Sequence, residues 1–228
     1  MTIGIVLTEK LRKAYPGAMV GILGIHGLVN PDLDTALQDR AAQVQAQIRA
    51  RFAGTDRTQL VAIPSLQAYA SYYKRFGKTY HVQLQLESVL FKGKSIAGPS
   101  AIVQAMFMAE LKNQLLTAGH DLERVQADIV VDVSLGTESY TLLSGGEQTL
   151  KAGDMFIRDE ESILSSIIHG PDQRTRITSE TRAILFTVYA PPGIPKAEVK
   201  AHLADLEANV RVFSPQAVVE TREVFAAA

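Results

Sequence analysis

The segment 169–181 gathers charged, hydroxyl and imidazole side chains between two apolar stretches. A polar loop between buried strands is a usual place for a binding or reacting site. The segment opens with His169, whose ring titrates near physiological pH, and Gly170, which would let backbone N–H groups approach a ligand closely. We therefore predict His169 and Gly170 as the catalytic pair. The alternative is a histidine in an ordinary surface turn.

Four more side chains of this loop are suited to a phosphate or a sugar: Arg174, Arg176, Thr178 and Thr181. Guanidinium groups bind phosphate through paired hydrogen bonds, and hydroxyl groups bind ribose. The alternative is structural, because arginines also pair with nearby carboxylates and threonines also cap turns. In the binding interpretation, these four residues contact the ligand.

Three side chains earlier in the chain are candidates for the same site. Glu110 and Phe107 are three residues apart on one face of a predicted helix. Glu110 could orient a water molecule or bind a ligand amine, and a solvated helix face is the alternative. His120 follows a glycine in a turn and is a candidate for the lining of the pocket, whereas Asp121 is expected to cap that turn.

The elements that position these residues are helices in the first half and strands in the second. The patterns predict helices at 31–53, 65–76, 86–90, 102–116 and from 195 to 213, and strands at 3–7, 18–28, 128–133, 139–143, 154–158, 162–168, 182–190 and 216–225. This order is typical of an α+β fold with mainly antiparallel pairing.

The loop 169–181 leaves one buried strand and returns into another, so it should lie at a rim of the β core. We expect Arg174 and Arg176 at the mouth of a pocket between the 101–116 helix and the 162–190 strands.

The amino-acid composition excludes several kinds of partner and binding site. The 228 residues are 46% apolar, the net charge is −1 and there is no cysteine. A near-neutral chain lacks the broad basic surface that duplex nucleic acid requires, so we expect no DNA partner. A chain without cysteine has no thiolate metal site, and its five histidines lack ligand spacing. We therefore expect no metal, no cofactor and no membrane segment, and a cytoplasmic location.

A series of short motifs resembles the B3/4 domain of the phenylalanyl-tRNA synthetase β chain, and above all freestanding proteins built on that domain. In order they are Tyr73, Phe76-Gly77, Lys92-Gly93-Lys94, Gly119-His120-Asp121-Leu122, Gly153-Asp154, Asp159, Arg174-Thr175-Arg176-Ile177-Thr178 and Thr181. The likeness covers about 65–192 and, more weakly, 15–30.

The resemblance implies helices flanking a mainly antiparallel, barrel-like β core. It also implies a tRNA-binding protein that hydrolyses mischarged aminoacyl-tRNA in trans, with the aminoacyl-tRNA 3′ end as partner and without aminoacylation activity. The chain departs from the pattern at Gln104 and Phe107, where relatives carry aspartate and asparagine, and at Leu90-Phe91, where they carry two arginines. A non-catalytic module that binds RNA or a small amino acid-like ligand is therefore the alternative.

Three parts of one compact unit are expected. They are an N-terminal α/β subdomain at 1–78, a B3/4-like domain at 79–192 and a C-terminal helix at 193–228 that packs on the same unit. That helix has an apolar stripe that could also face a second copy, so the oligomeric state stays open.

Overall fold

The computed structural model describes residues 4–126 and 128–227. Its helices are α1 (Glu9–Ala14), α2 (Thr35–Arg51), α3 (Arg57–Val61), α4 (Pro64–Lys74), α5 (His81–Phe91), α6 (Ala101–Asn113), the 3-10 turn η1 (Leu122–Arg124) and α7 (Lys196–Phe213). Its strands are β1 (Ile5–Leu7), β2 (Met19–His26), β3 (Leu116–Asp121), β4 (Ile129–Val133), β5 (Ser139–Thr141), β6 (Glu147–Thr149), β7 (Met155–Arg158), β8 (Ile163–Ser166), β9 (Gly170–Pro171), β10 (Ala183–Ala190) and β11 (Val218–Ala226).

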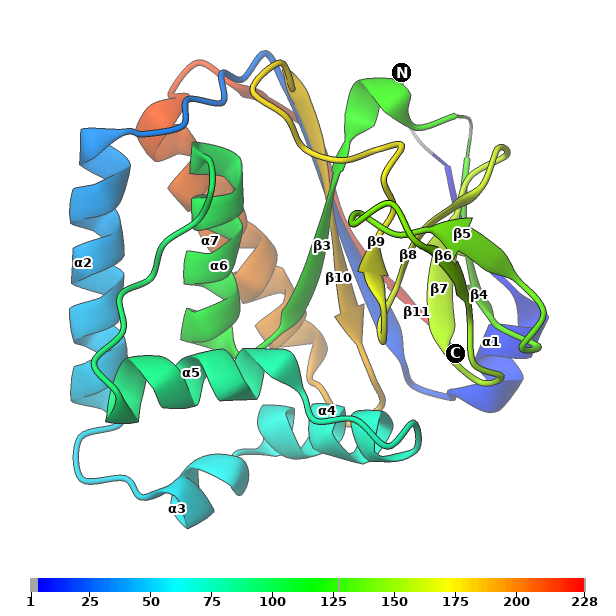
Figure 1. Cartoon of the computed structure of the whole chain (residues 1–228), viewed down its shortest axis with the longest axis horizontal. Helices are drawn as coiled ribbons and strands as arrows, with labels where there is room; N and C mark the ends of the chain where they lie inside the picture. The colour runs from blue at the N-terminus through cyan, green and yellow to red at the C-terminus, as the bar shows by residue number, and fades with distance from the viewer. Residues whose placement is uncertain (1–3, 127, 228) are drawn as a thin grey trace.

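A four-stranded central sheet separates a layer of helices from a second sheet (Figure 1). The strand order of the central sheet is β11-β2-β10-β3, and all its pairs are antiparallel. The second sheet has the order β1-β4-β7-β8-β9, in which only β1 and β4 run parallel among the described strands. A small β5–β6 hairpin adjoins the second sheet (Figure 1).

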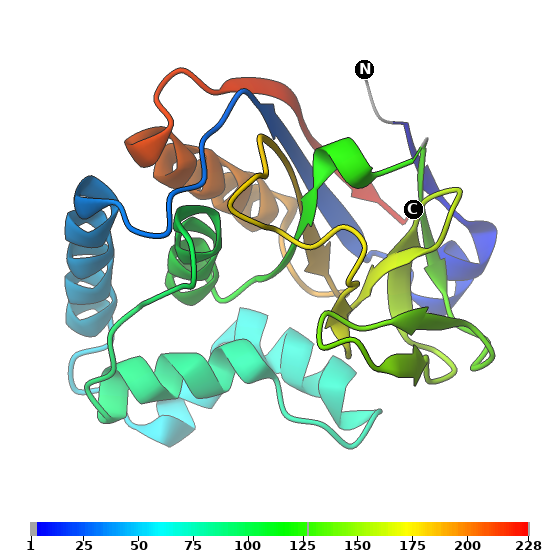
Figure 2. The ribbon, with the colours of Figure 1, turned by 45° about the horizontal axis from the view of Figure 1, so that its top comes forward.

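Helices α6 and α7 cover the other face of the central sheet, and α2 packs on their far side (Figures 1 and 2). Helices α4 and α5 lie across the ends of α2 and α6 (Figures 1 and 2). The apolar stripe of α7 faces this sheet, with Val199, Leu203 and Leu206 buried. Gly21 of β2 makes this close packing feasible, because a Cβ there would stand 2.8 Å from Val199 Cγ1. The stripe that could have faced a second copy is thus used inside the chain.

The predicted α+β fold with a mainly antiparallel core is confirmed. Both large sheets keep edge strands among the described residues, so the core is not a closed barrel. Instead the edges approach one another, since β3 contacts β9 and β1 contacts β11. The central sheet takes strands from all three proposed parts of the chain, with β2, β10 and β11 side by side.

Helix boundaries follow local capping. Thr8 accepts a hydrogen bond from the N–H of Leu11 and caps the start of α1. The predicted start of α2 at Pro31 is wrong, because Asp34 caps the helix by accepting from the N–H of Leu37 at 2.8 Å. The predicted end of α6 near Leu116 is also wrong. Gln114 adopts a left-handed conformation with φ of 57°, and the chain then turns into β3.

None of the described helices combines the length and hydropathy that crossing a lipid bilayer requires.

Candidate functional site

A cavity of about 360 Å³ lies where α6, β3 and the β8–β9 turn meet. Volumes of roughly 300–1,000 Å³ are usual for small-molecule sites. The lining is mostly apolar, with few polar groups. It comprises His81, Pro99, Val103, Met106, Phe107, Glu110, Leu116, Thr117, Ala118, Gly119, Leu143, Ser166, Ile167, Gly170, Pro171, Arg176, Ile177 and Tyr189. The predicted pocket between the helix and the later strands is therefore present.

Glu110 is the acidic side chain of this lining and is only 2% exposed. Its Oε1 accepts a hydrogen bond of 2.7 Å from the backbone N–H of Thr117. Burial raises the pKa of Glu110 to about 8, although the bond from Thr117 opposes the shift. The carboxyl group is therefore mainly protonated at neutral pH and ionises in the mildly alkaline range.

The free edge of β3 forms one wall of the cavity. The N–H of Thr117 donates to Glu110, and the N–H of Asp121 donates to the carbonyl of Thr175 at 2.7 Å, so both point away from β10. The alternation of an antiparallel ladder turns the N–H and C=O of Gly119, which lies between them, toward the same side. Gly119 lines the cavity, and its lack of a side chain lets Ile177 pack closely, since a Cβ there would stand 2.9 Å from Ile177 Cδ1.

The two loop arginines have different surroundings in the structure. Arg176 is exposed at the cavity and, within residues 4–126 and 128–227, takes part in no ion pair. Arg174 does not line the cavity; its Nη2 lies 2.7 Å from Oδ2 of the buried Asp159 and its Nη1 lies 3.3 Å from Oε2 of Glu161. Arg176 is therefore the cation available to a ligand, and Arg174 pairs with carboxylates.

His169 and Gly170 are adjacent in sequence but line different hollows. Gly170 lines the cavity in a left-handed conformation with φ of 81°, which favours glycine. His169 instead lines a shallower hollow that shares Leu143 and Pro171 with the cavity. Burial, followed by the charges of Lys78 and Lys151, lowers the pKa of His169, so its ring is mainly neutral.

His120 is fully buried and does not line the cavity. Its Nδ1 lies 2.8 Å from Oγ1 of Thr175, and its Nε2 lies 3.1 Å from Oγ of Ser165. The Thr175 hydroxyl donates in turn to Asp172, and Ser165 Oγ lies 2.7 Å from the hydroxyl of Tyr189 at the cavity. A buried polar chain thus joins the cavity wall to the 172–176 loop and fixes that loop.

Thr178 and Thr181 hold the loop together. Thr181 is fully buried; its hydroxyl donates to Asp121 Oδ2 at 2.9 Å and accepts from the N–H of Thr178 at 3.0 Å. The carbonyl of Thr178 accepts from Asn30 at 2.8 Å. The expected cap by Asp121 is confirmed, since its Oδ1 accepts from the N–H of Glu123 at the start of η1.

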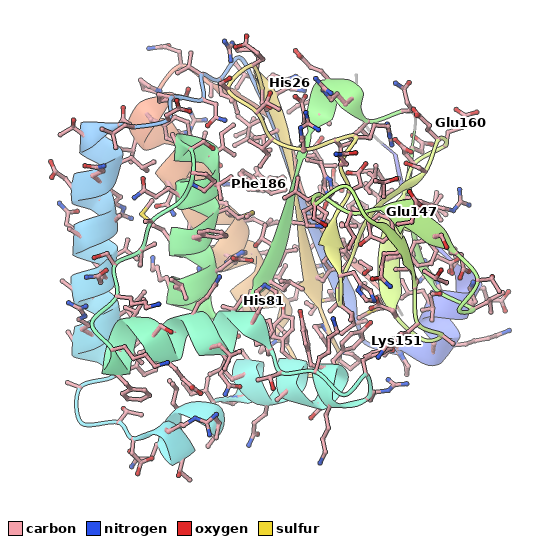
Figure 3. The ribbon with its side chains drawn as sticks, in the orientation of Figure 1. His26, His81, Glu147, Lys151, Glu160 and Phe186 are labelled. Carbon is pink, nitrogen blue, oxygen red and sulfur yellow. The ribbon has the colours of Figure 1, made fainter. Side chains whose placement is uncertain are left out.

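Two titratable rings next to the cavity are neutral at physiological pH. Burial lowers the pKa of His202 to about 4, and its Nε2 lies 2.7 Å from the hydroxyl of Thr117. Burial also lowers the pKa of His81, which stands beside the first residues of β3 (Figure 3). The ionisation of Glu110 is therefore the charge change within the cavity between pH 7 and 9. Over the described part of the chain, no three His, Cys, Asp or Glu side chains gather so as to hold a metal ion.

Sequence reasoning placed Glu110 and Phe107 on one helix face, and both line the cavity. It missed Gly119, Tyr189 and His81. Gly119 carried a signal, since a glycine inside an apolar run marks a close backbone approach. Tyr189 and His81 carried none, because the former lies in an all-buried strand and the latter begins a helix far away in sequence.

Comparison with known proteins identifies a family and similar solved structures. The B3/4 domain family matches residues 68–212. Among solved structures, an N-terminal fragment of the phenylalanyl-tRNA synthetase β-subunit from Pyrococcus horikoshii is similar, with a TM-score of 0.49 and 14% identity. That likeness covers 97% of this chain and 55% of the fragment, so the chain spans about half of its length. No curated protein matches. The family match extends over more than half of the 228 residues, and the chain belongs to the B3/4 domain family.

Proposed function

We propose that this protein binds the aminoacyl end of a mischarged tRNA and hydrolyses its ester bond. The observation that supports the proposal most is the apolar cavity that joins a buried Glu110 carboxyl group to Arg176, which forms no ion pair among the described residues, in a B3/4 family member. An aminoacyl ester needs an apolar site for its side chain, a hydrogen-bond donor for its carbonyl and a base for water. The tRNA partner rests on the family resemblance to the phenylalanyl-tRNA synthetase β chain.

The proposed chemistry is direct attack by water. The ionised Glu110 takes a proton from a water molecule, whose oxygen forms a bond to the acyl carbon. The tetrahedral intermediate then expels the ribose oxygen, which takes the proton that Glu110 accepted and leaves as a hydroxyl, while the amino acid leaves as a carboxylic acid that ionises into solvent. The N–H of Gly119, on the free edge of β3, is the donor that would stabilise the developing oxyanion.

A direct test is deacylation of a panel of tRNAs charged with different amino acids. We expect one or a few of the esters to be hydrolysed well above the buffer rate. Glu110→Gln and His169→Ala should be compared on the best substrate, because Glu110 lines the cavity and His169 lines the neighbouring hollow. A loss confined to His169→Ala would return the catalytic role to His169. Buffer-level rates with every ester would reject the hydrolase.

Arg176→Ala is expected to weaken binding of the tRNA 3′ end by about 1–3 kcal/mol, the usual loss for a charged hydrogen bond. Removal of one phosphate contact should also flatten the salt dependence, because each neutralised phosphate adds to the salt slope of the affinity. The measurement is a Kd for tRNA at several salt concentrations. Arg182→Ala is the control, because Arg182 is exposed in the same region, pairs with Glu180 and is absent from the cavity lining. Equal Kd values for Arg176→Ala and the wild type at every salt concentration would show that Arg176 does not contact a phosphate.

The second candidate function is a non-catalytic binder of a free amino acid-like ligand. The position of His169 outside the cavity favours it, as does the mainly protonated state of Glu110 at pH 7, where a neutral carboxyl group donates a hydrogen bond rather than accepts a proton. A thermal-shift screen separates the two functions, because a ligand of the folded state raises Tm by mass action. Stabilisation by free amino acids without any effect of tRNA would support this candidate.

A further inference from the structure

A second cavity of about 380 Å³ adjoins the first. It lies between α5, α6 and the loop that joins them. His81 and Phe107 line both cavities. The other lining residues are Leu84, Gln85, Ser88, Val89, Lys94, Ser95, Ile96, Ala97 and Leu111.

The loop of this cavity is held firmly against the helices. The N–H of Lys94 donates to the carbonyl of Ser88 at 3.2 Å, and the N–H of Ile96 donates to Gln45 Oε1 at 3.0 Å. Ile96 is buried, and a Cβ on Gly98 would stand 2.6 Å from the backbone nitrogen of Gln104. The loop therefore packs directly on the start of α6, and the cavity is preformed.

The polar groups of the lining suit a phosphorylated nucleoside. Lys94 is exposed and, over the described part of the chain, forms no ion pair. Gln85 Oε1 is buried and has no hydrogen-bond partner among the described residues. The hydroxyl of Ser88 donates to Leu84 at 2.9 Å, so its oxygen can still accept. The lining thus offers a cation for a phosphate, an amide for a base and a hydroxyl for a sugar.

The apolar part of the lining suits a flat base. Leu84, Val89, Ile96 and Leu111 form aliphatic walls, and Phe107 supplies an aromatic ring. Bases stack favourably on aromatic side chains. A free phosphate would leave these walls uncovered, and a purely apolar ligand would leave Gln85 and Lys94 without partners.

We propose that the second cavity binds a nucleoside 5′-monophosphate group, with the base between α5 and α6 and the phosphate at Lys94. This inference rests on the proposed function in one respect: the bound group would be the terminal nucleotide of the tRNA. Its ribose would then lie beside His81 and Phe107, which both cavities share, and the ester would enter the first cavity toward Glu110.

The test is a titration of the full chain with adenosine 5′-monophosphate, followed by NMR. We expect the amide signals of α5 and of residues 94–97 to shift, with saturable binding. Lys94→Met should weaken binding about tenfold, as the loss of one charged contact does, and should leave binding of unphosphorylated adenosine unchanged. Gln85→Leu should weaken both ligands by a similar factor. Lys92→Met is the matched control, since Lys92 is exposed on the same turn but does not line the cavity.

The outcomes are distinguishable from those of the hydrolase proposal, because this titration involves no ester. Saturable binding that Lys94→Met weakens and Lys92→Met does not would support the nucleotide site, even if no tRNA is deacylated. Binding that is absent at millimolar ligand, or that the two lysine variants weaken equally, would overturn it, even if deacylation is observed. Inorganic phosphate that binds as tightly as the nucleotide would show that the cavity walls do not recognise a base and would overturn it as well.

Discussion

Replacing Glu110 with glutamine is expected to abolish most ester hydrolysis and, at the same time, to stabilise the protein at alkaline pH. Loss of a general base typically lowers a rate by about 10²–10⁴-fold. Because the pKa of Glu110 is about 8, wild-type kcat/KM should rise about tenfold per pH unit below that value and then level off. The remaining activity of Glu110→Gln should lack this inflection. Rates must be corrected for the uncatalysed hydrolysis of the ester at each pH.

The stability effect follows from the direction of the same shift. The pKa of Glu110 rises from 4.5 in the unfolded chain to about 8 in the folded protein. Between these values the folded state binds more protons, so the free energy of unfolding falls as the pH rises, by about 1.4 kcal/mol per unit at most. Below 4.5 the carboxyl group is neutral in both states, and above 8 it is ionised in both, so the slope vanishes at each end.

Glutamine cannot ionise, but its side-chain oxygen can still accept the hydrogen bond from the N–H of Thr117. The Tm of Glu110→Gln should therefore match the wild type near pH 5 and exceed it by about 5–10 °C near pH 8.5, given a few kcal/mol in a domain of this size. Glu160→Gln is the control, because Glu160 is exposed and does not line the cavity. Parallel Tm curves for Glu110→Gln and the wild type from pH 5 to 9 would show that burial does not raise the pKa of Glu110.

Periodicity in the sequence was enough to find the helix that carries Glu110. Residues three apart on a helix share a face, and Phe107 and Glu110 do line one cavity. Periodicity does not report depth, however. The alternatives for Glu110 were a ligand contact and a solvated face, and its burial depends on β3, which the sequence did not reveal. Leu115 and Leu116 continue the apolar run of α6, and only the left-handed turn at Gln114 separates the helix from the strand.

The roles of the loop side chains could not be assigned from the sequence because the loop has no repeating geometry. Arg174 and Arg176 are two residues apart, yet one pairs with Asp159 and the other lines the cavity. Likewise, His169 and Gly170 are adjacent but face different hollows. In an irregular segment, the direction of each side chain depends on tertiary partners such as Asp159, which lies at the end of another strand.

Arg174→Met is expected to destabilise the protein by about 3 kcal/mol while leaving tRNA binding and ester hydrolysis unchanged. Asp159 is 1% exposed, and breaking a buried ion pair leaves the remaining charge without a partner. Burial alone would raise the pKa of Asp159, but the N–H groups of Gln126 and Ser162, together with Arg174, lower it below its usual value. The backbone bonds remain in the variant, so Asp159 stays ionised at neutral pH without its counter-charge.

The pH dependence of the destabilisation and a comparison with Arg176→Met make this prediction specific. A lowered pKa contributes stability above the unfolded value of 3.8 that is lost as the pH falls through the folded value, so the Tm values of Arg174→Met and the wild type should converge as the pH falls below 3.8. Arg176→Met should behave in the opposite way, with an unchanged Tm and weaker tRNA binding, because Arg176 is exposed and unpaired among the described residues. Calorimetry and tRNA titrations of both variants measure the two effects. If Arg174→Met kept the wild-type Tm, or lost as much tRNA affinity as Arg176→Met, then Arg174 would belong to the RNA contact rather than to the buried pair with Asp159.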